Sequence, residues 1–236
     1  MKIKVKDGAS IYYQTYGDKK NKTLVFLHGN MEDSSFFKEQ VEYFSVSYHV
    51  VVLDTRGHGK SDWGRSLGSF KYNLRLLAED LRELVLSLNL KKYTLVGFSD
   101  GANIAMEFAS SGFEGLIGLV LIGGNLRPWG MKLGTLLEIF KDYIISYGKR
   151  NSIEKRKKLG LMLFEPRIST RRLTVIKVPT LVLAGANDLI RKRDTLRIGR
   201  LIKGSKVVII NEADHFFIYN NWNIFNKMLE QWLNSV

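Results

Sequence analysis

Short apolar runs alternate with amphipathic segments along the chain, and this alternation restricts the fold more than any other feature. The runs cover residues 23–27, 49–53, 93–96, 118–122, 180–184 and 207–210. Runs this short and this apolar are typical of strands that are buried on both faces, as in a parallel sheet. We therefore expect an α/β fold in which helices cover both faces of a mostly parallel sheet.

The segments between these runs show helical periodicity, most clearly over residues 72–90. There, Leu74, Leu77, Leu81, Leu84, Val85 and Leu88 recur at spacings of three and four, which places them on one helical face. Further helices are expected over 34–44, 100–110, 194–202 and 217–233. An antiparallel pair over 2–5 and 10–16, turned at Asp7-Gly8, brings the predicted sheet to eight strands.

The length and the alternation predict one domain with an insertion. The chain has 236 residues, enough to bury one core, so 1–236 is expected to form a single domain. The stretch from about 125 to 172 separates two predicted strands by more than one crossover helix requires. We interpret it as a small inserted helical lid.

The composition excludes several classes of chemistry. There is no cysteine, which excludes disulfides, thiolate zinc sites and a cysteine nucleophile. The segment Met1–Asp7 has no hydrophobic region of the secretory type, and no run of about 18 apolar residues occurs. We expect no transmembrane segment, a cytoplasmic location, and no metal or organic cofactor.

The net charge of +13 is concentrated in two stretches. Residues 141–177 hold 11 basic and 3 acidic side chains, and residues 191–206 hold 7 basic and 1 acidic. Such stretches form a solvated surface or attract anionic substrates, membranes or nucleic acid. They contain no recognised nucleic-acid-binding module, so we expect a small-molecule substrate, with its charge and the oligomeric state left open.

Residues 97–101 read Gly-Phe-Ser-Asp-Gly and match G-x-S-x-G between a predicted strand and a predicted helix. In such a turn the serine is held in a strained conformation, and glycine two residues away on either side lets the backbone fold back. An ordinary strand-to-helix turn rich in Gly and Ser is the alternative. Ser99 is the candidate nucleophile, and the residues that follow in chain order favour this interpretation.

A serine nucleophile needs a base, and the base needs a carboxylate that orients it. His215 follows the last predicted strand, whereas His28 and His58 lie in early loops and His49 begins a strand, where structural roles are commoner. Asp188 follows the preceding strand, which gives the order Ser, Asp, His. Asp214, next to His215, is better explained as a turn residue.

The backbone N–H groups of Asn30 and Asp100 are candidates for an oxyanion hole. Asn30 follows His28-Gly29 after a predicted strand, and Asp100 begins the helix after Ser99. The Asp100 carboxylate would repel a developing oxyanion unless its side chain turns away, so only its N–H is assigned a role.

Taken together, these residues resemble the α/β-hydrolase superfamily, in its serine-nucleophile, esterase- and lipase-like branch. The match also includes Asp-Thr-Arg-Gly-His-Gly-Lys-Ser over 54–61, a loop to which we assign a structural role. The resemblance implies the α/β-hydrolase fold, with a catalytic triad of Ser99, Asp188 and His215. Related dehalogenases and epoxide hydrolases use a nucleophilic Asp, which Ser99 excludes here.

In this superfamily the lid sets the choice of substrate. Eight residues of the insertion suggest an apolar pocket wall, although core packing is the commoner role for such residues: Trp129, Met131, Leu136, Phe140, Tyr143, Tyr147, Met162 and Phe164. Four of them are the candidate substrate contacts, namely Trp129, Phe140, Tyr143 and Phe164. The expected activity is hydrolysis of a carboxylic ester or thioester through an acyl-enzyme. The alternatives are a carbon–carbon bond hydrolase or lyase acting on an anionic substrate, and a ligand-binding receptor with slow turnover.

Overall fold

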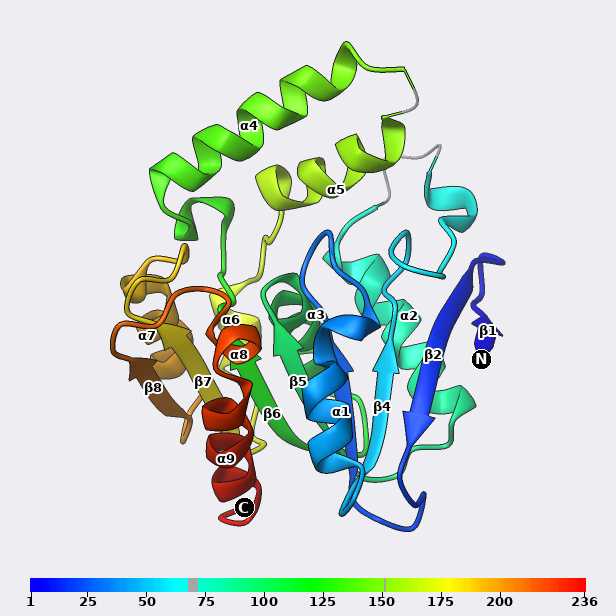
Figure 1. Ribbon diagram of the computed structural model, residues 1–236, viewed down its shortest axis with the longest axis vertical. Coiled ribbons are helices and arrows are strands. Elements are labelled where there is room, and N and C mark those ends of the chain that lie inside the picture. The colour runs from blue at the N-terminus through cyan, green and yellow to red at the C-terminus, as the bar shows by residue number, and fades with distance from the viewer. Residues whose placement is uncertain (68–71, 151) are drawn as a thin grey trace.

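A computed structural model describes residues 1–67, 72–150 and 152–236 and contains one eight-stranded sheet (Figure 1). The strand order is β1-β2-β4-β3-β5-β6-β7-β8, in which β2 pairs antiparallel with both β1 and β4 and the other five pairs are parallel. The strands are β1 (Lys2–Lys4), β2 (Ser10–Tyr16), β3 (Thr23–Leu27), β4 (His49–Leu53), β5 (Tyr93–Phe98), β6 (Leu116–Ile122), β7 (Thr180–Gly185) and β8 (Lys206–Ile210). The predicted eight-stranded, mostly parallel sheet is confirmed.

Helices cover both faces of this sheet. The segments are α1 (Lys38–Phe44), α2 (Leu74–Ser87), α3 (Asp100–Ala109), α7 (Lys192–Leu201), α8 (Phe217–Asn220) and α9 (Trp222–Leu233), with short 3-10 turns η1 (Ser34–Phe37) and η2 (Gly64–Ser66). In Figure 1, α1 and α9 lie in front of the sheet, whereas α2 and α3 lie behind it.

The core has two layers because successive side chains of a strand point to opposite faces. On β3, Val25 and Leu27 belong to the cluster that contains the buried residues of α2 and α3. Leu24 and Phe26 of the same strand belong to the cluster of α1 and α9. A strand buried on both faces has no polar alternation, which explains the continuous apolar runs of the sequence.

Two of the predicted helices are divided. The segment 34–44 begins as η1, where the Asp33 side chain accepts a hydrogen bond from the Ser35 backbone N–H, and α1 starts only at Lys38. The segment 217–233 breaks at Asn221, whose backbone (φ −125°, ψ 43°) is not helical. Asn disfavours helix interiors because its side chain competes for backbone hydrogen bonds.

The insertion between β6 and β7 contains η3 (Pro128–Gly130), α4 (Leu133–Tyr147), α5 (Ile153–Phe164) and α6 (Thr170–Leu173). Figure 1 shows α4 and α5 above the carboxyl ends of the central strands. No helix in the described part of the chain has the length and apolar composition needed to cross a bilayer.

The loop after β4 is fixed by buried ionic contacts, as its assigned structural role predicts. Arg56 is 1% exposed and donates two hydrogen bonds to Asp80 on α2 and two to Asp7 at the first turn. Burial raises the pKa of Asp80 to about 6, against the opposing effect of Arg56. Asp54 accepts hydrogen bonds from the backbone N–H groups of Ser34 and Lys60.

We expect Arg56→Ala to destabilise the fold by about 3–5 kcal/mol, because it leaves the Asp80 carboxylate buried without its cation. The free energy of unfolding in urea measures this loss. Lys38→Ala, which removes an exposed pair with Glu42, is the control and should change the free energy by less than about 0.5 kcal/mol. A loss of similar size in both variants would contradict the structural role of Arg56.

Candidate active site

Ser99 lies in the turn between β5 and α3 with φ 53° and ψ −119°, a conformation that non-glycine residues rarely adopt. Glycine is required on both sides of it. A Cβ at Gly97 would collide with the carbonyl oxygen of Gly101, and a Cβ at Gly101 would collide with that of Leu27. The tight turn therefore depends on these two glycines, and it presents the Ser99 hydroxyl above the carboxyl edge of the sheet.

The loops after β7 and β8 bring Asp188 and His215 to Ser99. His215 Nε2 lies 3.1 Å from Ser99 Oγ, and His215 Nδ1 lies 2.7 Å from Asp188 Oδ1. Both His215 and Asp188 are buried. With Nδ1–H donating to the carboxylate, Nε2 is left to accept the proton of the Ser99 hydroxyl. The arrangement can transfer a proton from serine to histidine.

The end of β6 leaves room for the imidazole ring. Gly123 has φ +60°, and a Cβ there would lie 2.7 Å from His215 Cε1. Asp214, the other nearby carboxylate, accepts a hydrogen bond from the Phe216 backbone N–H and so forms a local turn, as its position in the sequence predicts. Asp188 is therefore the carboxylate that contacts the His215 ring.

The loop after β3 comes close to Ser99 because it carries Gly29, where a Cβ would lie 3.1 Å from Ser99 Cβ. In the described residues, the N–H groups of Asn30 and Asp100 have no hydrogen-bond acceptor in the chain. The Asp100 side chain accepts hydrogen bonds from Asn30 Nδ2 at 2.9 Å and from Asn103 Nδ2 at 3.0 Å. These two amides hold the carboxylate beside the nucleophile.

The remaining histidines have structural contacts. His28 Nδ1 lies 2.7 Å from the carbonyl oxygen of Gly29, and His28 Nε2 accepts the Thr55 backbone N–H at 2.9 Å. Burial lowers the pKa of His28 and of His58, which favours their neutral forms. His49 contacts Thr23 at the start of its strand.

A cavity of about 120 Å³ adjoins Ser99 and His215. Most of its wall is apolar, and the insertion supplies part of it. The apolar lining residues beyond the loop of Ser99 are Met131, Ile139, Met162, Pro166, Leu189, Ile190 and Phe216. Met131 and Met162 were predicted as pocket wall. The other five were not, because a sequence pattern does not show which side of an inserted helix faces the sheet.

The four predicted lid contacts do not line this cavity. Trp129 and Phe140 are 61% and 53% exposed, and Tyr143 and Phe164 line a second cavity of about 500 Å³ on the other side of α5. On α4, Phe140 is exposed whereas its neighbour Ile139 lines the cavity beside Ser99. Trp129 lies in η3 and Phe164 at the end of α5, and neither lines that cavity.

Glu32 is a further cavity residue that sequence reasoning missed. Its Oε2 accepts the Gly29 backbone N–H at 3.0 Å, beside the loop of Asn30. Burial raises the pKa of Glu32 to about 7, and the charges of Asp33 and Asp100 act in the same direction. No sequence motif marks this position, because the effect depends on a loop contact and on burial.

Within the described ranges, no group of three or more His, Asp or Glu side chains is placed to hold a metal ion.

Comparison with known proteins identifies the family. A family model described as "alpha/beta hydrolase fold" matches residues 22–144. The chain belongs to the alpha/beta hydrolase fold family. This membership confirms the resemblance inferred from the sequence motifs and agrees with the observed sheet.

Individual relatives of this alpha/beta hydrolase differ in how much of their length they share with it. The AB hydrolase superfamily protein YisY of Bacillus subtilis is 26% identical over 99% of this chain and 98% of its own length. Epoxide hydrolase 3 of Xenopus tropicalis is 35% identical over 61% of this chain, but the match spans only 36% of that protein. The crystallised esterase EaEST of Exiguobacterium antarcticum has a TM-score of 0.83 at 21% identity, with 99% of each chain covered, which shows a shared fold.

The raised pKa of Glu32 predicts a pH-dependent contribution to stability. Because the folded-state pKa of about 7 lies above the ordinary 4.5, folding favours protonated Glu32, and this contribution is lost as the pH rises through 7. Between pH 5 and pH 8, the free energy of unfolding should therefore fall more for wild type than for Glu32→Gln. The difference should be about 1–2 kcal/mol after allowance for solvent screening. Urea unfolding at both pH values measures the difference. Glu138→Gln, on the exposed face of α4, should behave like wild type.

Proposed function

We propose that this alpha/beta hydrolase is a serine hydrolase that cleaves a carboxylic ester or thioester through an acyl-enzyme. The observation that supports it best is the chain of hydrogen bonds from Asp188 through His215 to Ser99. Such a relay turns a weakly nucleophilic hydroxyl into an effective one. Although epoxide hydrolase 3 is a relative, a serine at position 99 favours an acyl intermediate over the chemistry of an aspartate nucleophile.

In the proposed mechanism, Ser99 Oγ attacks the carbonyl carbon of the substrate while His215 Nε2 takes the hydroxyl proton. The carbonyl oxygen becomes an oxyanion and accepts hydrogen bonds from the N–H groups of Asn30 and Asp100. The carbon–oxygen or carbon–sulfur bond then breaks, and the alcohol or thiol leaves with the proton from His215. Water, deprotonated by His215, attacks the acyl group and releases the acid and free Ser99.

We further propose that residues 1–236 act as one catalytic domain and that the insertion over about 125–172 is its lid. The support for a lid is positional, since α4 and α5 lie above the carboxyl edge of the sheet and Met131, Ile139 and Met162 line the cavity. The cavity is small: an apolar cavity of about 150 Å³ accommodates one benzene molecule. A volume of about 120 Å³ therefore suits a short acyl group.

Ser99→Ala should lower kcat/KM for p-nitrophenyl acetate by a factor of about 10⁴ or more, because it removes the nucleophile. A fluorophosphonate probe should label wild type on the peptide that contains Ser99, as peptide mass spectrometry measures. Circular dichroism serves as the folding control for the variant. Activity of the folded Ser99→Ala protein at the wild-type level, or labelling at another serine alone, would refute the proposal.

The cavity volume predicts a preference for short acyl chains. With p-nitrophenyl esters, kcat/KM for the butyrate should exceed that for the octanoate by about tenfold or more, since pocket fit discriminates by this order for small changes in size. Ile139→Ala should enlarge the cavity and reduce the difference. Leu137→Ala, on the exposed face of the same helix, is the matched control. Equal rates for both chain lengths in wild type would show that this cavity does not hold the acyl group.

A further inference from the structure

The cavity beside Ser99 differs in charge from the rest of the molecule. Its lining includes three carboxylates, Glu32, Asp100 and Glu165, and its described lining residues include no lysine or arginine. The chain as a whole carries a net charge of +13. A concentration of negative charge inside a basic protein restricts which substrates can approach the reactive hydroxyl.

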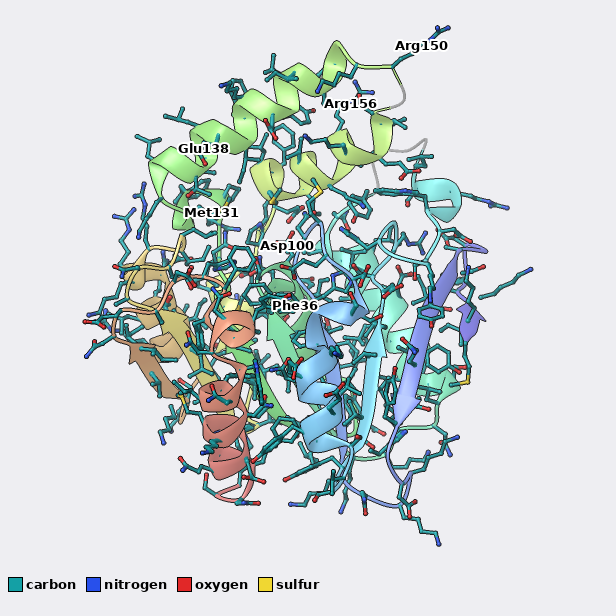
Figure 2. The ribbon with its side chains drawn as sticks, in the orientation of Figure 1. Phe36, Asp100, Met131, Glu138, Arg150 and Arg156 are labelled. Carbon is teal, nitrogen blue, oxygen red and sulfur yellow. The ribbon has the colours of Figure 1, made fainter. Side chains whose placement is uncertain are left out.

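The structure holds two of these carboxylates at the reacting centre. Asp100 is fixed by Asn30 Nδ2 and Asn103 Nδ2, and Asn103 is itself fixed by hydrogen bonds to Asn125. This network holds the carboxylate at the wall of the cavity. Figure 2 shows Asp100 at the carboxyl edge of the sheet, below α5.

Glu32 lies on the other loop of the candidate oxyanion hole. Only its Oε2 is used in the hydrogen bond to Gly29 N–H. Glu165, at the end of α5, also lines the cavity. The cavity therefore has carboxyl groups on the loop after β3, at the start of α3 and at the end of α5. Burial raises the pKa of each of them, so each gains from a neighbouring positive charge.

The nearby cations of residues 1–67, 72–150 and 152–236 do not line the cavity. Lys158 Nζ lies 6.0 Å from the centre of the Trp63 ring, although the carbonyl oxygen of Lys158 accepts a hydrogen bond from Asn30. Arg127 and Arg167 act on Glu165 electrostatically but do not line the cavity. Figure 2 shows Arg150 projecting outward beyond the end of α4.

We propose that this site selects esters or thioesters that carry a positively charged ammonium group close to the scissile carbonyl, and that it disfavours anionic ones. The inference rests on the proposed hydrolase function. An ammonium group held by Glu32 and Asp100 is attracted by their charge, and a primary ammonium also donates charge-assisted hydrogen bonds. Either kind of ammonium offsets the repulsion that these carboxylates exert on the oxyanion. A negatively charged substrate meets that repulsion twice, on entry and in the transition state.

The pH dependence of the preference follows from Glu32. Its carboxyl gains its charge as the pH rises through about 7, and it is influenced by Asp33, Asp100 and the Gly29 N–H. The preference for a cationic substrate should therefore increase from pH 6 to pH 8. Because matched substrates use the same catalytic residues, pH effects common to both substrates cancel in the ratio of their kcat/KM values.

Two matched pairs of esters test the proposal. In p-nitrophenyl β-alaninate, an ammonium group replaces the terminal methyl of p-nitrophenyl butyrate, and butyrylcholine is the cationic counterpart of 3,3-dimethylbutyl butyrate. In at least one pair the cationic ester should have a kcat/KM about tenfold or more above that of its neutral partner. One contact between opposite charges in a partly buried site contributes a factor of about this size. p-Nitrophenyl hemisuccinate should fall below the butyrate by a similar factor.

Variants assign the effect to the cavity. Glu32→Gln and Asp100→Asn should each reduce the cationic-to-neutral ratio by about tenfold. Glu32→Gln should also remove the increase of the butyrylcholine ratio between pH 6 and pH 8. Glu138→Gln, at a position on α4 that does not line the cavity, should leave the ratio unchanged. If Asp100→Asn does not fold, Glu32→Gln decides the result.

The outcomes separate the two proposals. Hydrolysis of the neutral esters that depends on Ser99, with cationic-to-neutral ratios near one in both pairs, would overturn the selectivity and leave the hydrolase function in place. A preference that is unchanged in Glu32→Gln would also overturn it. Loss of Ser99-dependent hydrolysis for every ester would instead refute the function on which it rests.

Discussion

The close approach of three backbone segments at the carboxyl edge of the sheet determines the rest of the site. Gly97 and Gly101 allow β5, α3 and the end of β3 to come so near that side chains at these positions would collide with backbone oxygens. Ser99, between them, is held at φ 53° by this packing. Strained residues of this kind persist only where the surroundings determine them, which here means the buried sheet on both sides.

The same packing explains why distant parts of the chain meet. In a parallel sheet the carboxyl ends of neighbouring strands lie at one edge, so the loops after β5, β7 and β8 lie together without any local sequence signal. Gly123 at the end of β6 leaves room for the His215 ring between them. The sheet order thus converts a serine, an aspartate and a histidine that are far apart in sequence into one hydrogen-bonded series.

The parts of this arrangement that depend on strand ends and on small local motifs were predictable from the sequence. The buried strands were visible as apolar runs, and the tight turn at Ser99 was visible through its flanking glycines. The helix breaks near Lys38 and Asn221 were not, because both segments keep their apolar pattern through the break. Local hydrogen bonds of Asp33 and the backbone of Asn221 decide those boundaries.

Only Met131 and Met162 of the apolar cavity wall were predicted, and the rest was missed for a different physical reason. On α4, apolar residues occur on two sides of the helix, so spacing alone cannot distinguish exposed Phe140 from cavity-lining Ile139. The charge of the cavity was also not predictable from the sequence. Glu32 and Glu165 come from loop and helix ends far apart in sequence, and the strongly basic composition suggested an attraction for anions instead.

The carboxylates beside Ser99 also affect the range of esters that the site can hydrolyse. An oxyanion hole lowers the barrier by presenting fixed positive dipoles to developing negative charge, and fixed negative charge nearby opposes that effect. Asp100 supplies both the positive dipole and the negative charge. Its N–H belongs to the candidate oxyanion hole, and its carboxylate is held close to that hole by Asn30 and Asn103. In the proposed selectivity, a neutral ester is still hydrolysed, but part of the oxyanion stabilisation is offset by these carboxylates. A substrate that brings positive charge close to the scissile carbonyl removes that offset.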